Sequence, residues 1–422
     1  MAAWRRATIL ALASSCAAAV LLAAPARADS CGAPLLSTCI NDDNFWPHAG
    51  PSQFMAIGGT ETVAKGQIGI GLVTSYLSRP VTLQLPSPGP NGSTANAIDN
   101  QANGTFLWSY GLTNRLELDA ALPITFAQNG GGTSPITGAS SQTAIQTTAV
   151  RDLRFGFAYS LLPRPRVDPR ARPNVDASGA PLPRPSYPMF GLTARLEMSA
   201  PTGDQNQFAG ESSAVYIPSV AADFRRNRIF AGAEVGARLR PISELAGARV
   251  GSQVAVAVGG GYDILPRELL SAMVEVRALP GFAEQSTTQE NPNGLVSTPN
   301  GRIIAPAEWA VSVRSAPLRG GDFAIQLAGG GPIPFSSESA ITNPRFRFSL
   351  GIRYEPVARD SDHDGILDKD DACPGIKGVK GGKGGDGCPP SLEHERLDLS
   401  GPASTSPPAP PAPDQAPVEP NR

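Results

Sequence analysis

The sequence predicts an all-β protein: an antiparallel transmembrane β-barrel of about twelve strands, followed by a short calcium-binding loop module and a disordered C-terminal tail. The first observation is composition, because the 422 residues include 45 Gly and 42 Pro, which disfavour long helices. The second is an alternation of apolar and polar residues that recurs between residues 66 and 356. The third is that long and short connections take turns along this region, a pattern typical of bacterial outer-membrane barrels.

Composition also excludes several classes of function. The formal net charge is −2 and only 17% of residues are charged, so there is no basic excess to bind nucleic acid. Residues 66–356 contain no His, Lys or Cys. This region therefore lacks the usual zinc ligands and the usual base for a Ser or Cys nucleophile, and we expect no enzyme.

The first element is a secretory signal peptide over residues 1–28. Arg5 and Arg6 precede an Ala/Leu-rich stretch over residues 7–24, and Ala-Arg-Ala at 26–28 forms a small-residue cleavage site. An uncleaved membrane anchor is the less favoured alternative, because two Ser and one Cys interrupt the apolar run. Export predicts an oxidising compartment.

Four Cys remain after the signal peptide and lie as two local pairs. Three pairings are possible, and spacing favours Cys31–Cys39 and Cys373–Cys388. The first pair lies in residues 29–65, which also contain the Gly-rich stretch 57–60. We expect this N-terminal segment either to stay in the periplasm or to enter the barrel as a plug.

The barrel itself is predicted over residues 66–356. Its clearest strand is 115–127, where Leu116, Leu118 and Leu122 share one face while Glu117 and Asp119 share the other. The twelve predicted strands are 66–77, 104–111, 115–127, 150–162, 189–201, 213–224, 228–240, 250–263, 268–279, 307–316, 322–330 and 345–356.

The connections and aromatic residues favour a membrane barrel over a soluble β-sandwich. Long connections such as 78–103 and 280–306 fall on one side, and most connections on the other side are tight turns; the Pro-rich segment 163–188 is the exception. Aromatic residues are expected on the apolar face at the two rims: Tyr110, Tyr159, Phe190, Tyr262, Phe323 and Tyr354 at the periplasmic rim, and Tyr76, Phe126 and Trp309 at the outer rim.

If the apolar face meets lipid, the other face lines the lumen. The charges on this face predict cross-strand ion pairs. Two interpretations remain open: an Arg-rich constriction that selects anions, or, in the favoured one, a salt-bridged interior that conducts little. The predicted lumen residues are Arg115, Arg154, Arg195, Arg238, Arg240, Arg277, Arg314, Arg345, Arg347 and Arg353, with Glu117, Asp119, Glu197, Glu234, Glu275 and Glu308.

Two segments of this region resemble a known class. Gly-Leu-Thr-Asn-Arg-Leu-Glu-Leu at 111–118 and Gly-Leu-Thr-Ala-Arg-Leu-Glu-Met at 191–198 are similar to turn-and-strand units of transporter-like and outer membrane protein A-type barrels of proteobacteria. The last strand, which ends at Tyr354, resembles the signal that the barrel assembly machinery reads. The resemblance implies two partners, outer-membrane lipid and this machinery, but no particular solute; the oligomeric state stays open.

An acidic loop follows the barrel, within residues 357–390. Acids at its first, third and fifth positions bring three carboxylates together, and Gly365 permits the turn that calcium loops need. The predicted Ca²⁺ ligands are the side chains of Asp360, Asp362, Asp364, Asp368 and Asp371 and the backbone carbonyl of Ile366.

The wider pattern, with Cys373 and Pro374 after the acids, resembles a thrombospondin type 3 repeat. The resemblance implies the same Asp ligands and a disulfide at Cys373. Such a repeat often joins a barrel to a peptidoglycan-binding domain, but the Pro-rich tail over 391–422 is too short to form one. Peptidoglycan binding is therefore not supported.

Together these features predict a structural or channel/transporter-like outer-membrane protein with its tail in the periplasm. The alternative is a surface or secreted adhesion module, in which a soluble β-sandwich is stiffened by calcium.

Overall fold

The computed structural model describes residues 35–89, 92–137, 145–164, 189–265, 269–291, 294–318, 322–334 and 343–357, then 359–360, 362, 364–368, 370–382 and 384–389. The predicted signal peptide (1–28), Cys31, most of the connection 163–188 and the predicted tail (391–422) lie outside the described residues. The chain divides into two compact units, one up to Arg359 and one from Asp360.

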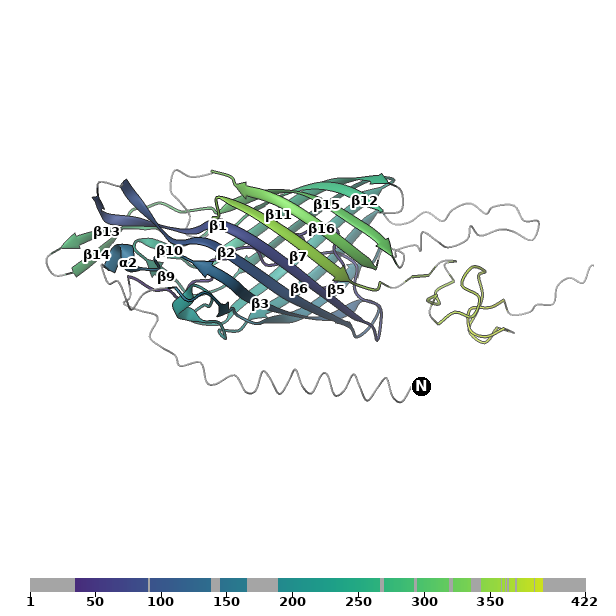
Figure 1. Cartoon of the computed structure of the whole chain (residues 1–422). Helices are drawn as coiled ribbons and strands as arrows, with labels where there is room; N and C mark the ends of the chain where they lie inside the picture. The colour runs from purple at the N-terminus through teal and green to yellow at the C-terminus, as the bar shows by residue number, and fades with distance from the viewer. Residues whose placement is uncertain are drawn as a thin grey trace, which may run out of the picture. The chain divides into compact units, whose positions relative to one another are not determined.

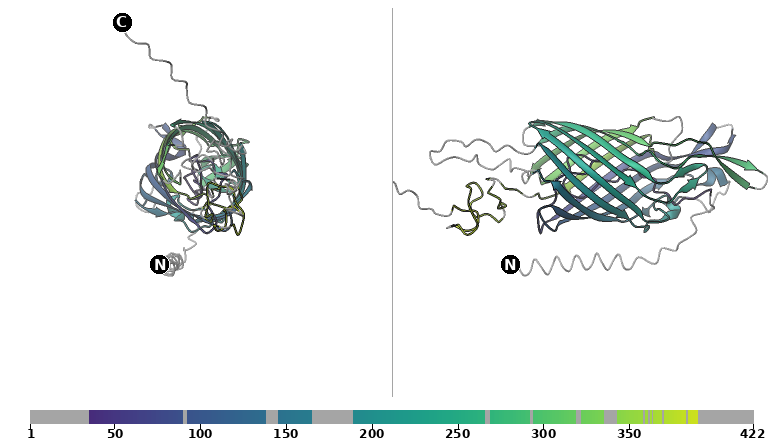
Figure 2. Two further views of the ribbon diagram at one scale, coloured as in Figure 1. Left: turned by 90° about the vertical axis from the view of Figure 1, so that its right-hand side faces the viewer. Right: turned by 180° about the vertical axis from the view of Figure 1, so that it is seen from behind.

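One antiparallel sheet in the first unit closes into a barrel, as predicted (Figures 1 and 2). Neighbouring long strands pair in chain order, β1 pairs with β17, and the β2–β3 pairing completes the ring. The twelve long strands are β1 (Ile68–Gly89), β2 (Gly92–Gly111), β3 (Leu116–Asn129), β5 (Arg154–Leu162), β6 (Phe190–Ser199), β7 (Val215–Arg226), β8 (Ile229–Arg238), β11 (Gln253–Leu265), β12 (Leu270–Ala278), β15 (Ala307–Leu318), β16 (Phe323–Pro332) and β17 (Phe346–Tyr354).

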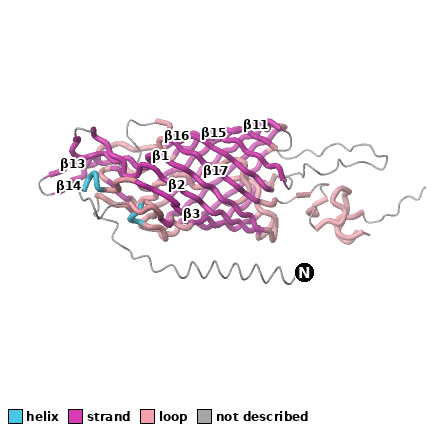
Figure 3. Tube along the Cα trace, in the orientation of Figure 1, coloured by secondary structure: helices cyan, strands magenta, loops and turns pink. Residues whose placement is uncertain are grey.

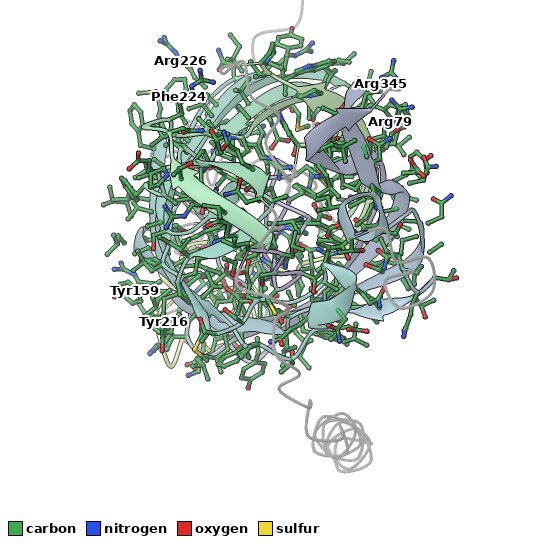
Figure 4. All side chains as sticks on the ribbon, turned by 90° about the vertical axis from the view of Figure 1, so that its left-hand side faces the viewer. Arg79, Tyr159, Tyr216, Phe224, Arg226 and Arg345 are labelled. Atoms are coloured by element: carbon green, nitrogen blue, oxygen red, sulfur yellow. A yellow bond between two sulfur atoms is a disulfide. The ribbon has the colours of Figure 1, made fainter. Side chains whose placement is uncertain are left out.

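Each of the twelve predicted segments falls on one of these strands. Since a single sheet closes on itself, the alternative of a two-sheet sandwich is wrong. The two faces of the wall differ as the alternation predicted, because Val274 is 49% exposed on the outside while Glu275 beside it is 3% exposed on the inside. In Figure 4 the labelled side chains of Tyr159 and Tyr216 point away from the ring.

The prediction that residues 78–103 form a loop is wrong, because β1 and β2 continue through most of it as a long hairpin. Pro80 and Pro86 interrupt the alternating sequence pattern that predicts a strand, but the chain still forms a strand there because of its tertiary packing. The apolar side chains of this extension are buried in a cluster built from Ile40, Val81, Leu83, Ala97, Ile98, Phe208, Leu245 and Val250.

Short elements of the other connections lie at this same end of the barrel, which we call the loop end (Figures 1 and 3). Among the described residues, no helix is long and apolar enough to cross a membrane. The short elements are α2 (Ser134–Thr137), β4 (Ala149–Val150), η1 (Gln205–Gln207), β9 (Ser243–Leu245), β10 (Ala248–Val250), β13 (Ser286–Asn291) and β14 (Gly294–Pro299).

The opposite end, which we call the turn end, holds the beginning of β1 and the end of β17. Ile68 pairs with Tyr110, and Phe323 pairs with Tyr354. Tyr110 and Phe190 are 42% and 59% exposed, so aromatic rings occupy the outer face of this rim as predicted.

The chain before β1 runs through the barrel from one end to the other. Leu36 bridges to Leu245 of β9 at the loop end, and Val63 bridges to Val357 at the turn end. Figure 2 shows chain inside the ring of strands in the view along the barrel. We call residues 37–60 the lumen segment.

Candidate functional site

The lumen segment fills the interior of the barrel. Nearly all of its residues are buried, including Cys39 and Ile40 at 0% exposure and Met55 at 3%. It forms no regular helix or strand, so its backbone amides need other acceptors.

Carboxylates on the inner wall supply those acceptors. Glu275 of β12 accepts from the amides of Met55 and Ala56, both at 2.8 Å. Glu234 of β8 accepts from the amide of Gly58 at 2.7 Å. Hydrogen bonds to ionised acceptors are stronger than neutral ones, so these acids hold the backbone of the lumen segment against the wall.

His48 of the lumen segment lies between two of the wall carboxylates. Its Nδ1 is 3.2 Å from Glu197 Oε1, and its Nε2 is 3.2 Å from Glu234 Oε1. A neutral imidazole carries only one N–H, so with both carboxylates ionised the two contacts are hydrogen bonds only when the ring is doubly protonated. The geometry therefore favours an imidazolium shared between strands β6 and β8.

Further ion pairs join the lumen segment to the wall. Asp43 is 2.9 Å from Arg347 of β17, and Arg347 is 3.0 Å from Glu308 of β15. Asp42 also forms an ion pair, with Arg151. Each pair is buried, and removing one partner would leave an uncompensated charge inside the protein.

Apolar contacts fit the same segment to gaps in the wall. A Cβ on Gly232 of β8 would lie 2.6 Å from Phe54 Cε2, and a Cβ on Gly259 of β11 would lie 2.8 Å from Phe54 Cε1. The Phe54 ring also packs against Phe230, with centroids 5.6 Å apart. The two wall glycines thus make room for the ring that occupies this part of the lumen.

The structure brings most predicted lumen residues inside. All six predicted acids are buried, and so are most of the ten predicted arginines. Arg115 and Arg345 were placed wrongly, because each lies just outside its strand end and is exposed. Arg277 pairs with Glu308 opposite it in the register, as a cross-strand pair, at 2.9 Å.

Sequence reasoning missed the residues of the lumen segment that meet this wall. Asp42, Asp43, Trp46, His48 and Phe54 lie in a stretch without strand or helix periodicity. The available signal was the concentration of acidic, amide and aromatic residues in Asn41–His48, next to a Gly-rich stretch. This signal does not indicate which wall residue each of them contacts, because those residues lie far away in the sequence.

Small cavities border the lumen segment. Cavities of about 30, 20 and 60 Å³ lie beside Phe45, Phe54 and Trp46 respectively. Such cavities hold a few water molecules or small ions at most. None of these three cavities has room for a larger solute.

The second unit contains the predicted calcium loop. Oxygens of Asp360, Asp362 and Asp364 lie within 4.8 Å of one another. Asp368 and Asp371 are outside this close group, and the amide of Ile366 donates to Asp364 Oδ1 at 2.7 Å.

Two of these acids are buried with free acceptors. Asp362 is 1% exposed and Asp371 is 9% exposed, and the Oδ2 atom of each has no hydrogen-bond partner among the described residues. Burial, with the neighbouring Asp364, Asp371 and Asp360 carboxylates, raises the pKa of Asp362 to about 6. Carboxylate oxygens that lie close together and accept no hydrogen bond are suitable ligands for a hard cation such as Ca²⁺.

The disulfide Cys373–Cys388 closes this unit and confirms that predicted pairing. Cys39 in the first unit is also disulfide-bonded, and Cys31, its predicted partner, lies outside the described residues.

Comparison with known proteins gave structural matches alone. No protein-family model and no curated protein sequence matches this chain. An outer-membrane channel from Pseudomonas putida F1 is similar, with 14% identity, a TM-score of 0.43, and 70% of this chain and 98% of that chain covered. A Pseudomonas aeruginosa FadL homologue shows 10% identity and a TM-score of 0.36, over 76% of this chain and 99% of that chain. The Ralstonia pickettii toluene transporter TbuX shows 8% identity and a TM-score of 0.32, over 69% and 90%. The barrel assignment itself depends on the strand pairing described above.

Proposed function

We propose that this protein is an outer-membrane channel whose lumen is closed by its own N-terminal segment. The proposal depends on one observation above all: residues 37–60 are buried among the inward-facing charges of a closed barrel whose outer face is apolar. An exposed apolar belt with aromatic rims suits lipid, and a charged interior suits water and polar solutes.

The contacts of the lumen segment suit a gate that can open. Many of its contacts are ion pairs and hydrogen bonds to wall side chains, such as those of His48, Asp43 and Met55. Water can replace such contacts when the segment leaves, whereas a large apolar core would resist exposure. Passage of solutes would therefore require displacement of the segment.

Conductance in planar lipid bilayers tests this proposal. The full-length protein is compared with a variant that lacks residues 37–60 but keeps all twelve strands. We expect a steady conductance at least tenfold larger in the deletion variant, and only small or brief events in the full-length protein. Equal conductance of the two folded proteins would contradict gating by the segment, and circular dichroism controls for folding.

We also propose that the second unit binds one Ca²⁺ through Asp360, Asp362, Asp364, Asp368, Asp371 and the Ile366 carbonyl. The close approach of the first three acids and the free oxygens on Asp362 and Asp371 support the site. Its sequence pattern resembles that of a thrombospondin type 3 repeat.

Calorimetric titration of the full chain with CaCl₂ tests this site. Asp362→Asn with Asp364→Asn should weaken binding at least a hundredfold, while Asp370→Asn, an exposed acid outside the ligand set, should leave it unchanged. Equal affinities in wild type and the double variant would exclude these ligands.

We further propose that the tail after the second unit lies in the periplasm, that lipid and the barrel assembly machinery are the partners, and that the protein is not an enzyme. The even number of strands supports a periplasmic tail, because β1 begins and β17 ends at the same end of the barrel.

A further inference from the structure

Arg238 of β8 is a buried cation without an anionic partner. It is 7% exposed, and no carboxylate within the described ranges lies close enough to form an ion pair with it. Its Nη2 donates to the carbonyl of Asn44 at 2.8 Å, and its guanidinium lies 3.9 Å from the centroid of the Trp46 ring. These neutral contacts satisfy some of its N–H groups but leave its charge uncompensated.

The charged groups around Arg238 make this imbalance larger. Arg154, Arg240 and Arg277 interact with it repulsively, and Glu211, the acid that attracts it, is already paired with Arg240. Arg240 is paired with Glu211 and Arg277 with Glu308, but two buried nitrogens of Arg154, Nε and Nη1, have no hydrogen-bond partner in the part of the chain that the structure describes. Arg154 also lies over the Trp46 ring, at 5.4 Å.

A cavity lies beside two of these arginines, Arg238 and Arg277. It has a volume of about 60 Å³, and Trp46, Arg238 and Arg277 line it together with the apolar side chains of Ile217, Val256 and Leu279. Two carboxylates, Glu197 and Glu234, also border the cavity, but both contact His48. The space suffices for a halide ion or a carboxylate the size of formate, with one or two waters.

We propose that this cavity binds one small monovalent anion between Arg238 and Arg277, beside Trp46. The anion neutralises the unpaired guanidinium, and the apolar side chains exclude larger or more strongly hydrated ions. It also connects the lumen segment, through Trp46 and Asn44, to strands β8 and β12. The site does not depend on gating, because binding can be measured in a protein that does not conduct.

Diffraction from crystals of the full-length protein grown in sodium bromide locates the ion directly. We expect an anomalous peak in contact with the Arg238 guanidinium; its absence from this cavity, when sodium formate also fails to raise the melting midpoint, would overturn the proposal. A peak that needs molar bromide and has no effect on stability would mean an adventitious ion only, and would also overturn it.

Melting of the detergent-solubilised protein measures the affinity. Sodium bromide or sodium formate replaces sodium gluconate at constant ionic strength, since gluconate is too large for the cavity. The midpoint should rise saturably in wild type, and Arg238→Gln should require at least tenfold more anion. Arg226→Gln, which changes an exposed arginine labelled in Figure 4, is the matched control and should behave as wild type.

The two anions distinguish the kinds of ligand. If formate raises the melting midpoint and bromide does not, the site selects carboxylates; if neither anion raises it, no anion binds and the proposal is overturned. If Arg238→Gln does not fold, the bromide peak in the wild type decides.

Discussion

His48 shows how one residue can hold the lumen segment in place. Its ring contacts carboxylates on two different strands, so it links β6 and β8 through the interior. His48→Gln keeps a side chain of similar reach but loses the positive charge. Because it leaves two buried carboxylates close together, we expect unfolding to become easier by about 3–5 kcal/mol. Chemical denaturation in detergent measures this loss.

A double-mutant comparison controls for simple loss of packing. In a protein that already carries Glu197→Gln and Glu234→Gln, the same His48→Gln change should cost far less. An equal cost in both backgrounds would show that the ion pairs are not what His48 contributes.

Two neighbouring glycines of β11 provide a matched test of how the segment fits the wall. A Cβ on Gly259 would clash with Phe54, whereas a Cβ on Gly260 meets only the Phe230 carbonyl, at 3.9 Å. Gly259→Leu should therefore destabilise the closed state by about 1–3 kcal/mol and raise conductance, while Gly260→Leu should do neither. Rescue of Gly259→Leu by Phe54→Ala would confirm the contact, and similar behaviour of the two leucine variants would contradict it.

At the residue scale the sequence predicted which wall residues face inward but not what they face. The alternation of Leu118 with Glu117 and Asp119 is enough to assign the two faces, because strand geometry fixes the period. The contact between His48 and Glu197 depends on how an irregular segment settles in a finished barrel. No local pattern encodes a contact between residues so far apart.

At the scale of elements, the lumen segment gives the chain a testable topology. It passes from Leu36 at the loop end to Val63 at the turn end, next to the start of β1. An epitope tag inserted just before Leu35 should thus be accessible to antibody on intact cells. A tag inserted after Asp398 should be accessible only after the outer membrane is opened. Accessibility of both tags on intact cells would contradict the proposed orientation.

The sequence pattern predicted some strands of the structure and missed others. The barrel strands were recognisable because one face is apolar along their whole length. The extensions of β1 and β2 were not, since their residues pack in a small cluster at the loop end instead of against lipid, and prolines interrupt them. The strands β13 and β14 were missed for another reason: they form a largely polar hairpin within the predicted connection 280–306, without an apolar face.

At the scale of the whole molecule, composition and topology agree. The inner wall needs cations that make forked hydrogen bonds to carboxylates, which Arg provides better than Lys, and no Lys lies between residues 66 and 356. The number and order of strands followed from the sequence. The occupied lumen did not, because residues 29–65 carry no signal that separates a periplasmic segment from an internal one.

The channel proposal depends on the outer face of the barrel meeting lipid, and two matched lysine substitutions test that claim directly. Val274 lies in the middle of β12, and Val296 lies on the β13–β14 hairpin beyond the barrel wall; they are 49% and 46% exposed. Unfolding of each variant is measured in lipid vesicles. We expect Val274→Lys to cost about 2–4 kcal/mol, because the charge enters the hydrocarbon layer, and Val296→Lys to cost almost nothing. Equal, small costs at both positions would contradict a membrane-embedded barrel.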